Sequence, residues 1–365
     1  MKILSLGTAT PPYAITLDDR HEVAEKFVAG DEKDRWFTPY IFEKSTVEKR
    51  YSVFLNSAEG SLLERQDFFT AVAELEDQTG PSTETRMKAY QQHATDLAIQ
   101  SCQKAFANAG IDPKQVTHLV TASCTGFSAP GVDIDLICKL PLRPTTSRTH
   151  LGFMGCHAGM NAMRVANAYA AADPNACVLV CSTELCTLHF QSVAENDQKV
   201  ANALFADGSG AAIIVGENFV SEKSTNWSLK ASGSCILPDT LPEMGWHISD
   251  HGFVMTLSER IPALILEHVR PWLESWLDQQ GMKLSDIASW AIHPGGPQIL
   301  HSAMRALQLK KDQLSCSYDV LKNYGNMSSA TIFFVLQETM KKDAKLPCVA
   351  MGFGPGLTIE VALFV

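Results

Sequence analysis

The sequence predicts an α/β fold of layered strands and helices, arranged as two halves with the same plan. Apolar strand-like runs alternate with helix-like runs, and these runs follow the same order in both halves. The length of 365 residues also exceeds one ordinary hydrophobic core. Because the halves share little literal identity, the duplication is inferred from the order of elements. We place the halves at residues 1–220 and 221–365.

The first half begins with an apolar strand that a Thr-Ala-Thr-Pro-Pro turn ends, followed by a charged helical region up to about residue 90. A helix follows because apolar residues recur at every third or fourth position until Gly110. A β-rich run, a short helix, a buried helix of small residues that starts near Cys156, and two strands complete the half. The expected ranges are 1–7, 88–109, 116–122, 133–140, 156–172, 176–182 and 211–216.

The second half repeats this order of strand, helix, strand, helix and closing strand pair. In each half a strand ends in a polar turn, and a Gly-Cys or Gly-Asn pair then opens a helix. The expected ranges are 227–232, 259–279, 287–292, 331–336, 348–351 and 357–365.

The composition excludes several classes of protein. Hydrophobic residues make up 45% of the chain and charged residues 19%, which is typical of a globular enzyme and not of a disordered protein. No apolar run reaches the roughly 18 residues that span a membrane, and the start is too short for a signal peptide, so we expect a cytoplasmic protein. The net charge of −10 argues against nucleic acid as a partner. Any phosphate group must therefore bind at a local basic cluster.

The ten cysteines are expected to be free thiols. The chain is large and lacks a secretory signal, which makes a disulfide framework a poor explanation for their even number. Several lie inside apolar strand-like runs, where a thiol behaves as a small hydrophobic group. The sequence holds no Cys-x-x-Cys pair, so we expect no metal site.

Three residues at the ends of predicted elements suggest nucleophilic catalysis. Cys156 stands at a predicted helix start, where free N–H groups favour a thiolate, lower its pKa and can bind an oxyanion. His293 ends an apolar strand, a common place for a site in α/β sheets, and could pair with a thiolate or donate to a carbonyl oxygen. Asn326 mirrors Cys156 at the other helix start and offers an amide donor.

Each of the three residues also has a purely structural explanation. Cys156 could pack at a tight crossing, His293 could stabilise a turn, and Asn326 is a good helix cap. Together they are more persuasive, because a cysteine, a histidine and an asparagine spread along an intracellular chain form a known nucleophile pattern.

The sequence resembles the chalcone synthase and type III polyketide synthase family over essentially its whole length. The resemblance implies a thiolase-like fold of five αβαβα layers with two duplicated halves, and a homodimer. Its most specific motifs are His-Pro-Gly-Gly and Gly-Phe-Gly-Pro-Gly. The matching stretches, in order, are residues 7–12 (Gly-Thr-Ala-Thr-Pro-Pro), 155–159 (Gly-Cys-His-Ala-Gly), 204–208 (Leu-Phe-Ala-Asp-Gly), 293–296 (His-Pro-Gly-Gly), 324–330 (Tyr-Gly-Asn-Met-Ser-Ser-Ala) and 352–356 (Gly-Phe-Gly-Pro-Gly).

The resemblance implies a decarboxylative condensation that uses acyl-CoA and malonyl-CoA as substrates and needs no cofactor or metal. The Cys156 thiolate would attack the acyl-CoA starter and become a thioester. His293 and Asn326 would donate to the thioester oxygen of malonyl-CoA and stabilise the enolate formed on loss of CO₂. The enolate would attack the thioester, and repeated extension would give a polyketide that cyclises in the same cavity.

The resemblance also implies residues that bind substrate. Phe205 and Phe253 match two aromatic residues that stand between the CoA tunnel and the cavity, although core packing would explain them as well. The glycines and the proline of the two specific motifs are expected at the same site: Gly295, Gly296, Gly354 and Pro355.

Lys44 matches a lysine that binds a CoA phosphate in the family. Phe37 and Tyr40 occupy the neighbouring positions that are basic in the family. We therefore expect that fewer basic residues bind the CoA phosphates here, or that other residues bind them. Other basic residues are possible substitutes, but a solvated run of charge explains them better: Arg35, Lys49 and Arg50.

Four cavity positions differ from plant chalcone synthases, which have threonine and serine at such places. A cavity lined by cysteines and small residues could admit an alkyl chain. We therefore expect a fatty-acyl starter and an alkylpyrone or alkylresorcinol product. The positions are Cys124, Thr125, Cys186 and His189.

Three alternative functions remain to be weighed. Ketoacyl-ACP synthase III has the same fold and performs one condensation, but its histidine motif is usually His-Gln-Ala-Asn. A papain-like peptidase also uses Cys, His and Asn, but Cys156 lacks that family's flanking residues. A non-catalytic acyl-binding protein would be expected to lose one of the three polar residues, and all three are present.

Overall fold

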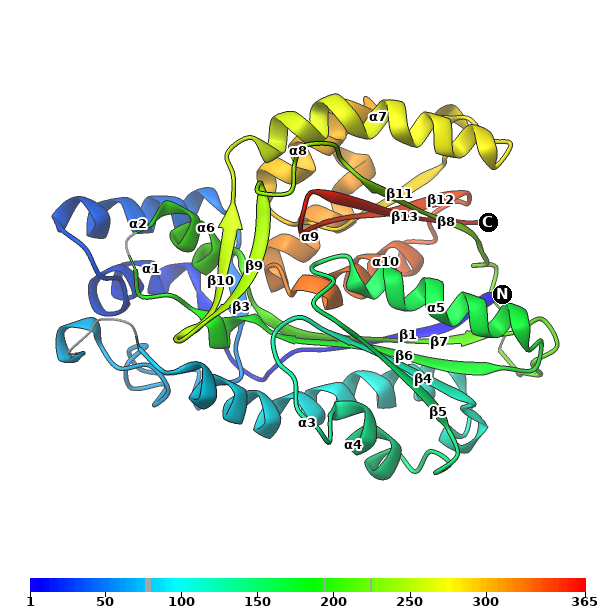
Figure 1. Ribbon diagram of the computed structural model, residues 1–365, viewed down its shortest axis with the longest axis horizontal. Helices are drawn as coiled ribbons and strands as arrows, with labels where there is room; N and C mark the ends of the chain where they lie inside the picture. Colours follow the sequence, from blue (N-terminus) through cyan, green and yellow to red (C-terminus); the bar gives the residue numbers. More distant parts are fainter. Residues whose placement is uncertain (76–79, 194, 224) are drawn as a thin grey trace.

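The computed structural model describes residues 1–75, 80–193, 195–223 and 225–365, and it has the five layers that the resemblance implied (Figure 1). Two sheets lie one above the other with a pair of helices between them, and further helices cover both outer faces. One apolar core fills the space between the sheets, and two more fill the spaces under the outer helices. The predicted αβαβα order is therefore confirmed.

The N-terminal sheet has five strands in the order β1-β7-β6-β4-β5. Strands β4, β5 and β6 run parallel to one another, and β7 is antiparallel to both of its neighbours. Every residue of β6 and β7 is buried, because helices cover both faces of the sheet. The strands are β1 (Lys2–Ala9), β4 (His118–Ser123), β5 (Ser147–Gly152), β6 (Cys177–Leu185) and β7 (Asp207–Val215).

The C-terminal sheet repeats this topology with four strands in the order β8-β13-β12-β11. Here β12 runs parallel to β11 and antiparallel to β13, as β6 does to β4 and β7. Edge strand β5 has no counterpart in this sheet among the described residues. The duplication predicted from the order of elements is thus present in the pairing. The strands are β8 (Leu229–Ile236), β11 (Ser289–Ile292), β12 (Cys348–Gly354) and β13 (Thr358–Phe364).

Two buried helices, α5 (Ala158–Ala172) and α10 (Thr331–Lys341), form the central layer. They approach closely because α5 carries Gly159 at the crossing, where a Cβ would collide with the carbonyl oxygen of Ser329 and the Phe333 ring. A short 3-10 turn, η8 (Ser328–Ala330), leads into α10. This contact brings the starts of both central helices together.

The outer helices complete the layers. On the N-terminal sheet, α3 begins five residues earlier than predicted, because Ser82 caps it with a side chain that accepts a bond from Thr85 N at 3.3 Å. Helices α8 and α9, between two predicted elements, were not expected from the sequence. The outer helices are α3 (Thr83–Ala109) and α4 (Val132–Lys139) on one side, and α7 (Ile261–Gln279), α8 (Pro297–Leu307) and α9 (Ser315–Tyr324) on the other.

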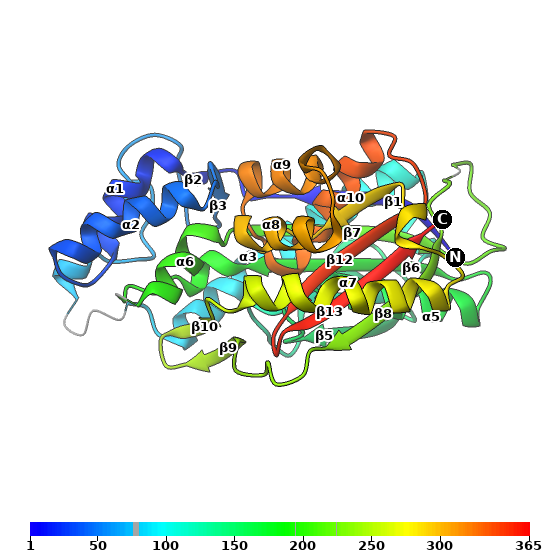
Figure 2. The ribbon, with the colours of Figure 1, turned by 90° about the horizontal axis from the view of Figure 1, so that it is seen from above.

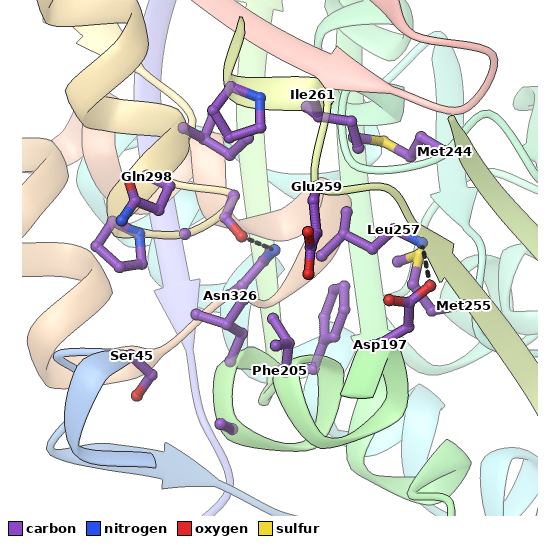
Figure 3. Close-up of a pocket in the computed structure, with 18 of the residues that line it drawn as sticks. Ser45, Asp197, Phe205, Met244, Met255, Leu257, Glu259, Ile261, Gln298 and Asn326 are labelled. Atoms are coloured by element: carbon purple, nitrogen blue, oxygen red, sulfur yellow. Dashed lines mark hydrogen bonds between the residues drawn. The ribbon is translucent and has the colours of Figure 1, made fainter. Parts of the chain in front are cut away.

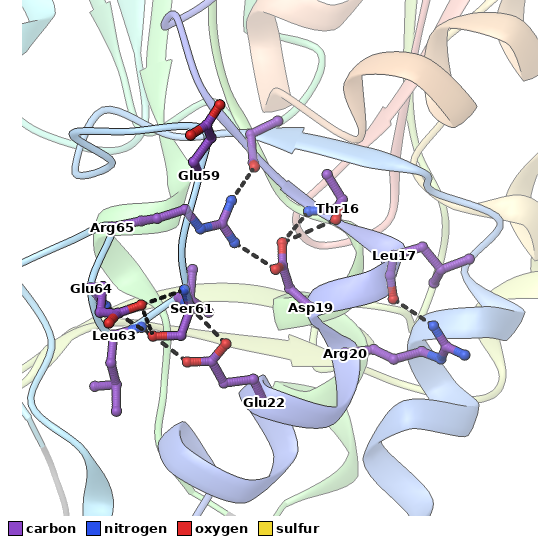
Figure 4. Close-up of polar contacts among 12 residues, drawn as sticks. Thr16, Leu17, Asp19, Arg20, Glu22, Glu59, Ser61, Leu63, Glu64 and Arg65 are labelled. Atoms are coloured by element: carbon purple, nitrogen blue, oxygen red, sulfur yellow. Dashed lines mark hydrogen bonds and ion pairs between the residues drawn. The ribbon is translucent and has the colours of Figure 1, made fainter.

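A smaller region extends from one end of the layers (Figures 1 and 2). It contains the charged N-terminal helices, helix α6 and an unpredicted hairpin of β9 and β10. Two contacts join residues 19–22 to residues 62–65 within this region (Figure 4). Arg65 forms an ion pair with Asp19 at 2.5 Å, and Glu22 accepts hydrogen bonds from the backbone N–H groups of Leu62 and Leu63. Its elements are β2 (Ala14–Thr16), α1 (Arg20–Glu22), α2 (Glu32–Lys44), β3 (Lys49–Tyr51), α6 (Asn196–Leu204), β9 (Met244–Ser249) and β10 (Gly252–Leu257).

Short turns of 3-10 or π type connect these elements. They are η1 (Leu17–Asp19), η2 (Val23–Phe27), η3 (Val72–Glu74), η4 (Pro113–Gln115), η5 (Cys186–His189), η6 (Leu284–Asp286) and η7 (Lys311–Leu314). All ten cysteines are free thiols, as predicted. None of the helices in the described part of the chain combines the length and apolar character needed to cross a membrane.

The close crossing of the central helices predicts that Gly159→Ala destabilises the protein. The added methyl group would push α5 away from Ser329, and such overpacking costs about 1–3 kcal/mol of unfolding free energy. Thermal unfolding measures the loss. Gly152→Ala is a matched control, because a Cβ there meets only the His150 ring at ordinary contact distance. Equal melting temperatures for the two variants would contradict the prediction.

Candidate active site

The predicted cysteine, histidine and asparagine line one cavity of about 330 Å³. Figure 3 shows this cavity around Asn326 and Phe205. Cys156 comes from the segment before α5, His293 from the end of β11, and Asn326 from the segment before η8. The structure therefore brings together three residues that are far apart in the sequence.

Cys156 lies just before helix α5 and not inside its first turn. The helix begins at Ala158 with His157 as its cap, two residues later than the sequence predicted. Gly155 has a positive φ of 81°, and a Cβ there would collide with the Pro355 ring. Only glycine therefore fits before the nucleophile, which explains the Gly-Cys pair.

Asn326 is held with its amide group directed toward the loop after His293. Its Oδ1 accepts a bond from Ser328 N at 2.9 Å, and its Nδ2 donates to the carbonyl oxygen of Gly295 at 3.3 Å (Figure 3). The backbone of Asn326 also pairs with the segment around Phe205. The residue is thus both a local cap and an oriented amide donor.

His293 is buried, and neither ring nitrogen has a hydrogen-bond partner among the described residues. Its backbone N–H continues the β11–β12 pairing by donating to the carbonyl oxygen of Met351 at 2.7 Å. Burial lowers the pKa of His293 to about 3, with a smaller effect from His157. The ring is therefore neutral and has one N–H free to donate into the cavity.

Burial raises the pKa of the Cys156 thiol to about 11. Hydrogen bonds from the Ser328 and Asn326 side chains favour the thiolate and oppose this shift, while the negative charge of Glu184 adds to it. The sequence predicted a lowered pKa from a helix start, so the shift has the opposite direction. Desolvation is the largest effect on this thiol, which lies outside the first turn of α5.

A buried carboxylate organises the wall beside Cys156. Glu184 accepts bonds from Cys124 N at 2.9 Å, Thr125 Oγ1 at 2.7 Å and the Ser329 hydroxyl. Cys124 and Thr125 therefore face a smaller second cavity that also contains Cys156 and Cys186. Three of the four predicted cavity positions thus line the second cavity with Cys156. Thr125 uses its hydroxyl on Glu184, and the Cys124 thiol accepts a bond from Gly155 N at 3.0 Å.

Phe205 stands where the sequence placed it, because it lines the main cavity, the second cavity and a third one beyond. The expected role of Phe253 beside Phe205 stays a prediction. Phe253 is fully buried, stacks on His189 and borders the third cavity alone. Met255, two residues along the same strand face, borders the first two cavities with Phe205 instead.

His189 lines the third cavity, but both its ring nitrogens are already used. Nε2 donates to the carbonyl oxygen of Thr125 at 2.7 Å, and Nδ1 accepts from Phe253 N at 3.0 Å. Burial lowers the pKa of His189 to about 3, which keeps the ring neutral. His189 therefore shapes the cavity and has no free polar group for a substrate.

Lys44 lies at the mouth of the main cavity, as predicted. Its Nζ sits 5.3 Å from the centre of the Tyr40 ring. Lys44 is the one basic residue among the described residues that line this cavity, whereas Asp197 and Glu259 are acidic (Figure 3). The mouth thus has little positive charge for phosphates.

The motif glycines divide into two groups. Gly295 and Gly296 line the main cavity, as predicted. Gly354 borders none of the four cavities found among the described residues, and a Cβ there would collide with the His157 ring. Pro355 borders the second cavity and packs on Gly155. The Gly-Phe-Gly-Pro-Gly motif therefore supports the segment around the nucleophile from behind.

Sequence reasoning missed four residues at the site. Ser328 bonds to the thiol, and three hydrophobic residues of the β9–β10 hairpin line the cavities. The alternation of apolar residues over 244–257 was the available signal for this hairpin. The missed residues are Ser328, Met244, Trp246 and Met255.

The shared cavity predicts that His293 controls ionisation of Cys156. The buried ring is neutral and has an N–H without a partner among the described residues, so it can donate to the Cys156 thiolate and oppose the rise in thiol pKa that burial causes. His293→Leu removes this donor, so the midpoint pH for alkylation of Cys156 by iodoacetamide should be higher than in wild type. Identical midpoints in wild type and variant would show that the two groups do not interact.

Known proteins match this chain over nearly its whole length. The sequence profile described as "Chalcone and stilbene synthases, N-terminal domain" matches residues 1–218, and that of the C-terminal domain matches residues 228–365. The alpha-pyrone synthesis polyketide synthase-like protein Pks18 of Mycobacterium tuberculosis is 34% identical over 372 aligned positions, covering 99% of this chain and 90% of that protein.

Solved structures agree over the whole chain. The C-terminal type III polyketide synthase domain of Steely1, a type I/III hybrid from Dictyostelium, has a TM-score of 0.89 and 29% identity, covering 100% of this chain and 98% of that one. CsyB, solved in complex with CoA-SH, has a TM-score of 0.87 and 25% identity, covering 100% and 99%.

These matches decide between the functions that the sequence left open. A condensing acyltransferase is supported, and a peptidase, a ketoacyl-ACP synthase III and a non-catalytic binding protein are not. The chain belongs to the chalcone and stilbene synthase family and is a type III polyketide synthase.

Proposed function

We propose that the enzyme loads an acyl-CoA starter on Cys156, extends it with malonyl-CoA and releases an α-pyrone. In the first step the Cys156 sulfur attacks the starter carbonyl carbon, a C–S bond forms, and the CoA thiolate leaves. The location of Cys156 in both the main and the second cavity supports this role. CoA would enter by the mouth at Lys44, and the acyl chain would point toward the second cavity.

His293 and Asn326 would drive the loss of CO₂ from malonyl-CoA. The imidazole N–H and the amide N–H₂ donate to the thioester oxygen, which becomes negative as the carbon–carboxylate bond breaks. The unpartnered ring nitrogens of His293 are the observation that carries this proposal. The enolate carbon then attacks the thioester on Cys156, the Cys156 thiolate leaves, and the extended chain is now a thioester of CoA. Cys156 takes this chain back by the same attack, with loss of the CoA thiolate, before each further round. After the last round an enol oxygen attacks the thioester carbon, the thiolate leaves with the enol proton, and the lactone closes.

A fatty-acyl starter is supported by a series of cavities that continues past the nucleophile. The second and third cavities share Cys186, Phe205 and Trp246. The third and fourth share Ile15, Phe54 and Phe190, and the lining of the fourth is almost entirely apolar. An alkyl chain of moderate length would therefore find apolar contacts at its far end, as the relative named for α-pyrone synthesis also suggests.

The site predicts separate effects for its three polar residues. Cys156→Ala should still release CO₂ from malonyl-CoA but form no polyketide, whereas His293→Gln and Asn326→Ala should lose about 100-fold or more of the decarboxylation rate. Radioactive malonyl-CoA and mass spectrometry of products with starters of graded length measure both activities. The starter proposal is wrong if aromatic starters alone give product.

We also propose that the enzyme is a cytosolic homodimer. Ten unpaired thiols fit a reducing compartment. Strand β5 lies at the edge of its sheet with one side unpaired, and an exposed apolar patch adjoins its end. A second copy would cover this patch, which consists of Phe127, Phe153 and Met154, exposed by 53%, 39% and 38%.

The patch predicts that Phe127→Glu weakens the dimer, because a carboxylate would be buried against the second copy. Sedimentation velocity at several protein concentrations should show more monomer than for wild type. Trp36→Glu is the control, since Trp36 is 73% exposed on α2, far from β5 (Figure 1). If Phe127→Glu sediments as wild type does, the dimer forms through another surface.

A further inference from the structure

A buried cation with a free donor stands on the wall of the third cavity. Arg50 of β3 was expected in a solvated charge run, but it is only 1% exposed. Its Nη1 donates a long bond of 3.4 Å to the carbonyl oxygen of Ala203, and its Nη2 has no hydrogen-bond partner among the described residues. The guanidinium carbon lies 4.5 Å from the centre of the Phe42 ring. Arg50 therefore lines the third cavity and has one N–H₂ group without a partner among the described residues.

No carboxylate pairs directly with Arg50 among the described residues. Burial lowers the pKa of Arg50 to about 10, and the more distant charge of Asp19 opposes this shift. Asp19 itself is already held by Arg65 and by Thr16 N at 2.7 Å (Figure 4). Arg50 is thus still charged near neutral pH, and a buried charge without a partner is costly. An oxygen atom from a bound molecule would remove that cost.

The position of Arg50 along the series of cavities indicates which part of a bound molecule would supply this oxygen atom. Toward Cys156 lies the second cavity, and away from it lies the fourth, whose lining is apolar apart from Gln66. Both polar atoms of the Gln66 side-chain amide are hydrogen-bonded to the backbone of residues 68 and 69. The starter's tail at that end is therefore hydrocarbon. Oxygen atoms that reach the third cavity come from condensation, because each round inserts a carbonyl group next to Cys156 and moves the earlier ones deeper.

We propose that Arg50 is a binding site for the β-keto oxygens of the growing polyketide and thereby sets how many extensions occur. The proposal rests on the proposed function. A 1,3-dicarbonyl group forms an enolate readily, and a nearby cation without a counterion favours that anion. An oxygen held by Arg50 is kept away from the thioester carbon on Cys156, which delays lactone closure and allows another extension.

The experiment compares two buried arginines. Arg86 is also fully buried with an unpartnered Nη2, but it lines none of the four cavities. With one acyl-CoA starter and malonyl-CoA, Arg50→Met should lower the ratio of tetraketide to triketide products about tenfold, the effect expected for loss of a charged hydrogen bond. Arg86→Met should keep the wild-type ratio. Mass spectrometry gives the ratio, and decarboxylation of malonyl-CoA shows that each variant is folded.

An unchanged ratio in folded Arg50→Met would overturn the proposal, as would a wild type that releases triketides alone. An equal fall in Arg86→Met would also overturn it, because a loss of stability would then explain both. If Arg50→Met does not fold, Arg50→Lys keeps the positive charge but not the forked set of donors, and a smaller fall in the same ratio is expected. A wild type that makes no polyketide from any starter would instead contradict the proposed function.

Discussion

The contact between the two central helices is the constraint on which the site depends. Gly159 lets α5 lie against the segment that opens α10, and the Ser329 hydroxyl at the same crossing donates to Glu184 of β6. The starts of both helices therefore meet at one end of the two sheets. The segment with Cys156 and the segment with Asn326 come to the same cavity, and the end of β11 adds His293. The duplicated topology thus brings the three predicted catalytic residues to one cavity from two equivalent points and one strand end.

Burial sets the protonation states of this arrangement. The cavity favours a neutral thiol and a neutral imidazole, since burial raises one pKa and lowers the other. Charge appears when a thiolate or an enolate forms, and donors from His293 and Asn326 are already in place for it. Hydrogen bonds to a developing anion are strongest where solvent cannot compete. A neutral, oriented site is therefore better suited to enolate formation than a charged resting site would be.

The sequence was sufficient for the layered fold and for choosing three polar residues that line one cavity, because strand ends and glycine-marked helix starts are local signals. It was not sufficient where position depends on packing. Phe253 and Met255 share one face of β10, and only the fold shows that Met255 lines the same cavity as Cys156. Strand β5 has exposed positions on both faces and gave no apolar pattern. Arg50 lies in a charged stretch, and no local feature distinguishes a buried arginine there from a solvated one.

The other buried or half-buried cations show why Arg50 differs. Lys199 pairs with Asp34 at 2.6 Å, and Arg164 pairs with Glu360 at 2.8 Å. Arg86 has no acid, but it donates to three backbone carbonyl oxygens and borders no cavity among those described. Arg50 alone of these four combines an unused donor with a cavity wall. Because a structural arginine would be expected to fill its bonds from the protein, as Arg86 largely does, the unfilled donor is better explained by a ligand that comes and goes during the reaction.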